Sequence, residues 1–511
     1  MAIIDVDSVF QVGAVFPPNT ELKRLQLNRR FEAVFNGNIA TAFPDLPPRL
    51  TETVKNYKGE LIDFFNPINV KFGKLIPKKF ADFIFGRTPN VVHTTNSNLD
   101  KPIKQAIVKS NLWNNLKKSF MDCYKFGNGI VKCYNKSPIY VYEGNRTSGD
   151  AALSPIESIQ WIPQISEFDY NNVIGNIIGT VYAVDDKKTK YQILIEYYKN
   201  DGTYRKQVWD CSIPQAYGRV TLEKLVNTWN GKSALDDNPV KIFMGFSTTE
   251  DGVYGQSAYT FFYEILKEIV VRYTQIAKVI DKHAMPVMTG PTSALATDQK
   301  TGERYFKRGD YIAISPTDGS IPVKYMEWDG KLDASFQELD HLVGLLYQMS
   351  ETGAPFLDGD TDKLGFAESA RALKIRHKSP IAYANAWVSQ NENVIKESIK
   401  DVCKIQGLDI EAEDLEITYN LNLPEDELEQ SQIFNNKVKA GFSIVEEMKR
   451  DYRMNQDGAE TEFESYLEEQ RKINEVSGKQ TQPAQAGNET PESVRKSNDQ
   501  IGSPNKSVLS Q

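Results

Sequence analysis

The amino-acid sequence predicts a mixed α+β fold divided into several subdomains. At 511 residues the chain exceeds the usual size of one domain, and its 40% hydrophobic and 11% aromatic residues are sufficient for buried cores. Apolar residues spaced three or four positions apart, the helical period, are frequent between residues 257 and 405. Runs rich in Tyr, Val and Ile between residues 177 and 209 are typical of strands.

The first 256 residues are predicted to form an α/β unit. Helices are expected near residues 21–36, 49–65 and 101–125. Strands are expected at Ile177–Ala183, Tyr191–Tyr198 and Tyr204–Trp209. Lys188 and Thr189 lie in the predicted turn between the first two strands. Prolines and lysines interrupt the apolar residues 64–85, which favours partly buried helices over a membrane anchor. No run of 18 or more apolar residues and no signal peptide is recognised.

A long helix is predicted from Ser257 to His283. Its apolar stripe consists of Phe262, Ile265, Ile269, Tyr273, Ile276 and Ile280. The opposite face consists of Glu264, Lys267, Glu268, Arg272, Gln275, Lys278, Asp281 and Lys282. At a rise of about 1.5 Å per residue this helix spans roughly 40 Å. We therefore expect one packed face and one face directed to water or to a polar lumen.

A compact excursion and a second helix follow. Pro286 ends the first helix, and short strands are expected near Tyr311–Ile314 and Val323–Met326. Turns are expected at Met288–Pro291, Asp298–Gly302 and Thr317–Ser320. The second helix begins near Asp333, interpreted as its N-cap, and returns antiparallel to the first. Its apolar side consists of Phe336, Leu339, Leu342 or Val343, Leu346 and Met349. A plain αα-hairpin with an inserted loop fits this spacing equally well.

Residues 351–365 are predicted to be a loop because they contain three glycines, a proline and three aspartates. A third helix is predicted from near Phe366 to about Gln406, with a kink at or just before Ser379 caused by Pro380. Acidic helices from Glu425 to Lys439 and from Ser443 or Asp457 to about Glu475 follow. The last 35 residues, rich in Gln, Ser, Asn, Gly and Pro, are predicted to be disordered.

The order of these segments resembles that of the portal proteins, the head-to-tail connectors of tailed double-stranded DNA bacteriophages. The resemblance rests on Leu345–Gly353 leading into Gly365–Lys374 and on the long helix that follows. It extends to the glycine-broken turn at Tyr124–Lys132, the strand at Ile156–Pro163, the strand at Leu415–Asp426 and the helix link at Lys439–Ser443. It covers roughly residues 100–470 and is a likeness of segment order rather than of one short signature.

The resemblance implies a portal fold with the following parts: an α/β wing (1–256), a first stem helix (257–285), a small α/β clip (286–332), a second stem helix (333–351), a tunnel loop (352–366), a long kinked wing helix (367–415), a helical crown (416–476) and a disordered tail (477–511). It implies a homo-oligomeric ring of twelve copies at one capsid vertex, through which terminase pumps double-stranded DNA. It also implies contacts with the major capsid, scaffolding and head-completion or adaptor proteins, and none with a membrane. The expected location is the virion, with the host cytoplasm during assembly.

The candidate DNA-channel residues implied by the tunnel loop are Asp358, Asp360, Asp362 and Lys363. The three aspartates also mimic the opening of a calcium loop, but Lys363 occupies its sixth position, where glycine is expected, and Ser369 its twelfth, where an acid is expected. An ordinary surface loop is a third interpretation. We favour a mobile polar loop that contacts DNA, and we expect no metal and no cofactor.

The net charge of −8 disfavours a protein that holds nucleic acid on a generally basic surface. A conduit is different, because DNA that must slide should not be held tightly. Local lysine clusters are interpreted as solvated faces: Lys71, Lys74, Lys78 and Lys79, and Lys117 and Lys118.

Enzymatic motifs are few. Gly231-Lys232-Ser233 matches the end of a phosphate-binding loop, but Val226 stands where that loop requires its first glycine. His93, His283, His341 and His377 lack the three- or four-residue spacing of a helical metal site. The four cysteines have no C-x-x-C spacing and are expected to be reduced. We therefore predict a structural conduit without catalysis. The alternatives are a terminase-type packaging ATPase and another ring-forming virion connector.

Overall fold

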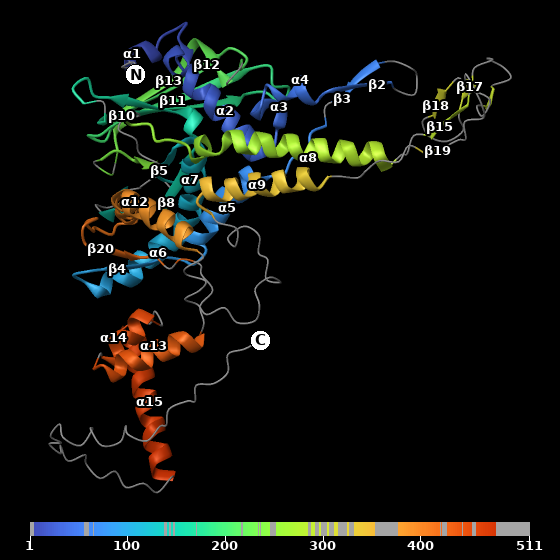
Figure 1. Ribbon diagram of the computed structural model, residues 1–511. Helices are drawn as coiled ribbons and strands as arrows, with labels where there is room; N and C mark the ends of the chain where they lie inside the picture. Colours follow the sequence, from blue (N-terminus) through green and yellow to red (C-terminus); the bar gives the residue numbers. More distant parts are fainter. Residues whose placement is uncertain are drawn as a thin grey trace, which may run out of the picture. The chain divides into compact units, whose positions relative to one another are not determined.

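The structure is a computed structural model, drawn in Figure 1. It describes residues 5–55, 61–64, 66–136, 141–142, 145–146, 149–169, 171–215, 218–233, 235, 237–245, 252–284, 288–291, 296–297, 304–305, 311–314, 324–325, 332–352, 377–419, 421, 427–441, 443–451 and 456–476. The chain divides into two compact units, Met1–Pro424 and Glu425–Gln511. Both sheets and helices are present, which confirms the predicted mixture of α and β structure.

The first unit contains a six-stranded antiparallel sheet with the order β1-β13-β12-β11-β10-β9. Its strands are β1 (Val15–Phe16), β9 (Trp161–Ile165), β10 (Val173–Ala183), β11 (Tyr191–Lys199), β12 (Thr203–Cys211) and β13 (Val220–Lys232). The three predicted strands are confirmed within β10, β11 and β12. Lys188 has a φ of 52° in the predicted turn, and the Thr189 N–H donates to Asp185 Oδ1 at 2.8 Å.

One face of this sheet forms a core of its own, because successive side chains of a strand point to opposite faces. Ile177, Ile193, Ile195 and Trp209 are buried there. On the other face, Glu196 accepts a hydrogen bond from Lys132 at 2.6 Å and pairs with Lys206 at 3.1 Å. Burial works against the charged form of Glu196, but the two ammonium groups outweigh it and lower its pKa. This ion cluster joins the six-stranded sheet to β5 of the second sheet.

The second sheet has the order β14-β5-β8, with β14 at Val240–Met244, β5 at Asn128–Asn135 and β8 at Ala151–Ile156. Helix α7 (Leu112–Phe126) runs into β5 through Gly127. Gly127 has a φ of 86°, and a Cβ there would lie 1.8 Å from the Gly255 carbonyl oxygen, so only glycine fits. This confirms the predicted glycine turn. The single strand predicted at 156–163 is wrong: the 3-10 helix η3 (Ser158–Gln160) separates β8 from β9.

The helices before this sheet agree with the prediction in part. Helix α2 (Leu22–Asn36) is confirmed. The helix predicted at 49–65 is wrong, because β2 (Glu52–Lys55) and β3 (Leu61–Phe64) form an antiparallel pair there, in which the β-branched Thr53 and Val54 favour the extended chain. The helix predicted at 101–125 is two helices, because Asn111 adopts a φ of 53° between them.

The remaining elements of this region are short, apart from α5 and α6. They are α1 (Val6–Val9), η1 (Asn19–Glu21), α3 (Ile39–Ala42), α4 (Leu46–Leu50), α5 (Phe72–Phe85), β4 (Asn90–His93), η2 (Ser97–Leu99), α6 (Asp100–Lys109), β6 (Val141–Tyr142) and β7 (Asn145–Arg146). Helix α5 lies in the apolar segment 64–85, where partly buried helices were expected, and it accommodates Pro77.

Two long helices enclose a β unit in the sequence. The 3-10 helix η5 (Ala258–Phe261) leads into α8 (Tyr263–Ala284), and α9 spans Asp333–Met349. Between them lie β15 (Met288–Pro291), β16 (Ala296–Thr297), β17 (Arg304–Tyr305), β18 (Tyr311–Ile314) and β19 (Lys324–Tyr325). The predicted strands at 311–314 and 323–326 are confirmed. Met288–Pro291, predicted as a turn, is instead the central strand of the sheet β18-β15-β19.

Helix α12 (Lys378–Ile405) supplies the main part of the predicted third helix. Pro380 lies in its first turn, where the missing N–H has no intrahelical partner to lose. The part predicted at 366–376 lies outside the described residues, so the kink stays a prediction. Strand β20 (Leu415–Thr418) confirms the start of the predicted strand and pairs with β4.

The second unit is helical and agrees with the prediction. Its helices are α13 (Glu427–Lys439), α14 (Ile444–Asp451) and α15 (Gln456–Val476). Gly441, with a φ of 95°, lies in the predicted link between α13 and α14. The predicted disordered tail, 477–511, lies outside the described residues.

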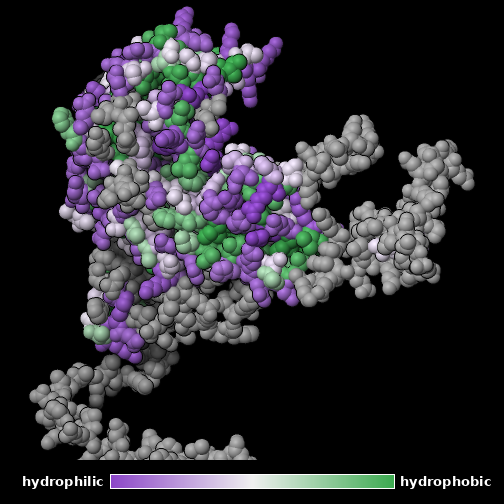
Figure 2. Space-filling model, turned by 45° about the horizontal axis from the view of Figure 1, so that its top comes forward, coloured by the Kyte–Doolittle hydropathy of each residue, from purple (hydrophilic) through white to green (hydrophobic). Residues whose placement is uncertain are grey.

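The main core of the first unit is aromatic. Trp387 of α12 packs edge-on against Phe120 of α7 and stacks on Phe243 of β14, with ring centroids 4.8 and 6.2 Å apart. All four cysteines are free and buried, as expected for reduced thiols, and burial raises the pKa of Cys123 and Cys403 to about 12. Figure 2 shows a mainly hydrophilic surface with separate hydrophobic patches. None of the helices described is both long and apolar enough to span a bilayer.

Candidate functional site

Helix α8 is packed on more than the predicted stripe. Phe262, just before it, and Ile269 and Ile276 of the stripe are buried, but Ile280 is 45% exposed. Leu266, Val270, Val271 and Thr274 are buried as well, so the packed face is wider than predicted. Because α8 contacts α4 as well as α9, a single stripe is not enough to cover its neighbours.

The polar face of α8 is held by ion pairs. Glu268 pairs with Arg49 at 3.0 Å and Lys267 with Asp45 at 3.3 Å. Further along, the Lys278 ammonium donates to the Leu50 carbonyl at 2.8 Å. The face predicted to meet water or a lumen therefore lies partly against α4 and the residues beside it. Surface pairs of this kind contribute little to stability but fix the direction of the helix.

Helix α9 lies antiparallel beside α8 (Figure 1). Arg272 of α8 pairs with Glu338 near the start of α9 at 2.9 Å, whereas Phe262, before α8, and Met349, at the end of α9, line one cavity of about 220 Å³. The predicted antiparallel return is thus confirmed. The predicted apolar side holds only in part: Leu339 and Leu346 are buried, but Phe336 is 45% and Met349 47% exposed.

The start of α9 differs from the prediction in one detail. Leu332 is the N-cap and makes no side-chain capping bond, while Asp333 is the first residue inside the helix. A carboxylate in the first turn still interacts favourably with the helix dipole. The predicted role of Asp333 as N-cap is therefore wrong by one position.

The chain after α9 is held by a buried polar joint, Ser350-Glu351-Thr352. Ser350 and Thr352 are buried, and their hydroxyl groups hydrogen-bond at 2.8 Å. The Thr352 N–H donates to the Tyr347 carbonyl at 3.2 Å, and Glu351 adopts a φ of 58°. A residue other than glycine in this region needs surrounding structure to hold it. The joint therefore sets the direction in which the chain leaves α9.

The Glu351 carboxyl lies among aromatic side chains. It lines the 220 Å³ cavity with Tyr124 and Tyr383, and a second cavity of about 260 Å³ with Tyr383 and Trp387. Burial raises the pKa of Glu351, and burial likewise raises the pKa of Tyr124 and Tyr383. These phenols stay protonated at neutral pH, so the site offers hydrogen-bond donors rather than nucleophiles.

The end of α9 and the first turns of α12 lie close together. Glu351, two residues after the last residue of α9, and Tyr383 of α12, which begins at Lys378, line the same two cavities. Residues 353–376, between them in the sequence, lie outside the described residues. Sequence reasoning missed this pairing, because the aromatic partners of Glu351 are distant in sequence and carry no common motif.

The predicted site residues Asp358, Asp360, Asp362 and Lys363 lie outside the described residues, as do all twelve positions of the possible calcium loop, 358–369. Across the part of the chain that is described, no group of three His, Cys, Asp or Glu side chains is arranged to hold a metal ion.

The phosphate-loop match is explained by the fold. Gly231 and Lys232 are the last residues of strand β13, paired with Tyr204 and Thr203 of β12. A phosphate-binding loop instead follows a strand and opens a helix. The extended conformation of these two residues therefore excludes the nucleotide-binding interpretation of the motif.

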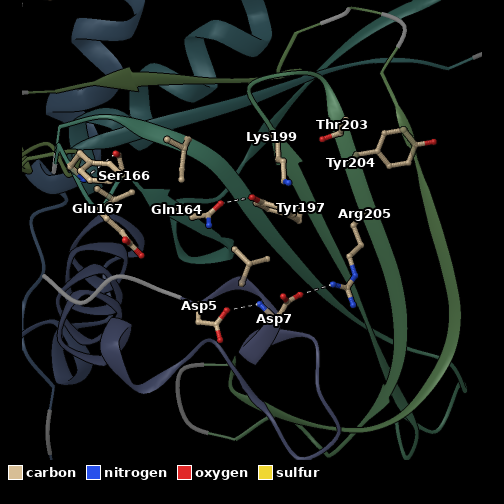
Figure 3. Close-up of a pocket in the computed structure, with 14 residues that line it drawn as sticks. Asp5, Asp7, Gln164, Ser166, Glu167, Tyr197, Lys199, Thr203, Tyr204 and Arg205 are labelled. Atoms are coloured by element: carbon tan, nitrogen blue, oxygen red, sulfur yellow. Dashed lines mark hydrogen bonds and ion pairs between the residues drawn. The ribbon is translucent and has the colours of Figure 1, made fainter.

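A broad cleft of about 880 Å³ lies on the six-stranded sheet, between α1 and strands β10 to β12 (Figure 3). Two pairs of polar groups lie in it: Asp7 with Arg205 at 3.0 Å, and the Tyr197 hydroxyl with Gln164. The first is an ion pair and the second a hydrogen bond between neutral groups, and neither is a nucleophile activated by an adjacent base. We assign no chemistry to this cleft.

Comparison with known proteins gives structural neighbours only. No family model matches the chain, and no curated protein matches it. One similar solved chain comes from the neck of a native gene transfer agent particle computed with C12 symmetry, with 11% identity, a TM-score of 0.41 and coverage of 74% of this chain and 89% of that one. A second comes from the virion of the native particle, with 12% identity, a TM-score of 0.39 and coverage of 88% and 99%. A third comes from the neck of the empty particle computed with C6 symmetry, with 12% identity, a TM-score of 0.38 and coverage of 73% and 87%. Similarity of this degree leaves family and function open.

Proposed function

We propose that the chain is a portal-type subunit of a tailed-phage-like particle, forming with its copies a ring that conducts DNA at one capsid vertex. One observation carries the proposal: the antiparallel helices α8 and α9 flank a β unit in the sequence, and the residues directly after α9 form a buried polar joint. In the proposal these parts are a wall element, a projecting element and the start of a loop, in the order that a conduit requires.

In this proposal α8 and α9 are the stem, and the strands between residues 288 and 325 belong to the clip. The sheets and helices up to residue 256, together with α12, form the wing, and α13 to α15 form the crown. The clip would meet terminase during packaging and a head-completion or adaptor protein afterwards. The capsid and scaffolding proteins would hold the outer surface of the ring.

The tunnel loop is proposed as the part that contacts DNA, through Asp358, Asp360, Asp362 and Lys363. The joint at Ser350–Thr352 supports this role, because it holds the chain directly before the proposed loop. Three carboxylates beside one ammonium repel phosphates on balance. The loop would therefore centre the duplex without binding it tightly.

The charge distribution supports a sliding contact. Asp333 and Asp340 on α9 are exposed, and each chain carries −8. A ring of twelve such chains would carry roughly 100 negative charges, which disfavours tight retention of a polyanion. We propose no catalytic role, since packaging energy would come from the separate motor.

Deleting residues 354–364 tests the loop assignment. Rings should keep their number of subunits, because the deletion leaves the joint at Ser350–Thr352 and α12 intact. Nuclease-protected DNA per particle should fall. An equally long deletion at 480–490 is the matched control and should leave packaging unchanged. Unaltered packaging and unaltered retention in the 354–364 deletion would refute the assignment. ATP hydrolysis by the purified chain would instead favour the terminase interpretation.

A further inference from the structure

The six-stranded sheet has an unpaired stretch on one edge. Strand β1 pairs only with Val220 and Thr221 of β13. Backbone hydrogen bonds of Gly13 and Ala14 extend this pairing to Leu222. From Glu223 to Gly231, no residue in the described ranges pairs with the outer edge of β13. Its apolar side chains are half exposed: Leu225 at 39%, Val226 at 49% and Trp229 at 46%.

A second unpaired stretch lies on the opposite edge. Strand β9 pairs with β10 only between Val173 and Ile178. Beyond Ile178, the described part of the chain offers no strand on this side of β10. Here Tyr182 is 41% and Val184 54% exposed. Among the described residues, the sheet therefore has two different edges without a pairing strand.

Free edges of this kind are normally protected. An exposed strand edge presents unpaired N–H and C=O groups to any other strand, and proteins usually block it with charge, proline or a bulge. The first part of the β13 stretch has two of these protections: Glu223 and Lys224 are charged, and the irregularities in the pairing with β12 fall between residues 222 and 227. Residues 228–231 have no charge and no proline and remain in regular register with β12, and residues 180–184 also contain no charge and no proline. These two stretches are thus left suitable for pairing.

We propose that neighbouring copies of this chain join these edges, with β13 of one subunit pairing with β10 of the next. This inference rests on the proposed ring. Within one sheet β13 runs antiparallel to β10, because each of β10, β11, β12 and β13 is antiparallel to its neighbour. A second copy set alongside in the same orientation therefore continues the antiparallel order across the junction.

The two edges also match in chemistry. Pairing them buries half-exposed apolar side chains on both sides and leaves no charge of residues 180–184 or 225–231 unpaired. Because the two edges differ, the contact is head-to-tail, and such a contact can repeat around a ring when the rotation between neighbours closes. An isologous contact between two β13 edges would stop at a dimer.

Cysteine cross-linking of Tyr182→Cys/Trp229→Cys tests the pairing. The four native cysteines are buried, so the introduced thiols are the reactive ones. Treatment of assembled rings with a short dithiol-reactive linker should give a ladder of covalent oligomers, whereas each single variant should stay a monomer on a denaturing gel. Rings of normal mass without a ladder would overturn the inference and leave the proposed function standing. Covalent dimers from Trp229→Cys alone would also overturn it.

Trp229→Lys provides an independent test. A lysine on this edge should raise the subunit concentration needed for half-assembly by at least about tenfold, since a buried charge opposes strand pairing. Val108→Lys is the matched control, because Val108 in α6 is also exposed, at 77%, and lies off the sheet. Equal assembly of both variants would overturn the inference, and a wild-type chain that forms no ring would overturn the inference and the proposed function together.

Discussion

Replacing Asn391 tests how α12 is fastened to the second sheet. Asn391 is buried, and its Oδ1 accepts a hydrogen bond from the Met244 N–H at 2.9 Å. Its Nδ2 donates to the carbonyl oxygens of Met244 and Trp387, each at 2.9 Å. The side chain thus satisfies both backbone groups of Met244 at the edge of β14, as a neighbouring strand would.

Asn391→Leu removes three hydrogen bonds while keeping a similar volume. At a net 0.5–1.5 kcal/mol for each bond, the free energy of unfolding should fall by about 3 kcal/mol. Asn391→Asp keeps the acceptor but loses both donors and buries a charge, so its effect should be at least as large. The measurement is urea-induced unfolding followed by tryptophan fluorescence, with Asn393→Leu, exposed on the same helix, as the control. A loss below 1 kcal/mol for both Asn391 variants would refute this account.

Two further predictions concern the same unit. Leu346→Ala leaves a cavity at a fully buried position of α9 and should lower the free energy of unfolding by about 2–5 kcal/mol. Met349→Ala, at the exposed end of the same helix, should change it by less than about 1 kcal/mol. Equal effects in urea titrations would contradict the packing described. Burial raises the pKa of Asp401 from 3.8 to about 7, so the folded chain holds this proton more tightly than the unfolded chain, and stability falls as pH rises through that window. The stability of Asp401→Asn relative to wild type should therefore increase between pH 5 and pH 8 by up to about 3 kcal/mol; a difference that is constant with pH would contradict this assignment.

The elements predicted correctly from the sequence are those with long, regular patterns. Helix α8 and strands β10 to β12 repeat their apolar residues over many positions, so local spacing was sufficient. The pair β2–β3 was missed because its segment mixes apolar and charged residues in an order that fits both the helical period of about 3.6 residues and the strand period of about two. The break at Asn111 depends on one residue with positive φ, which composition does not reveal.

The candidate site was less predictable because it is built from distant residues. The Met244–Asn391 contact joins positions 147 residues apart. One cavity at Glu351 combines residues of α7, α9 and α12, and the other combines α12 with Gly245. The exposure of Phe336 and Met349 shows the same limit, since an apolar residue on the predicted side of a helix is buried only where a neighbour covers it. The loop residues Asp358–Lys363 remain a prediction.

Electron microscopy with mass determination on the purified chain tests the central claim most directly. We predict closed rings of about twelve subunits with a central hole, as the proposed portal-type function requires. Rings that keep their number of subunits when residues 354–364 are deleted would show that assembly does not depend on the proposed loop. A compact monomer that hydrolyses ATP would contradict the account.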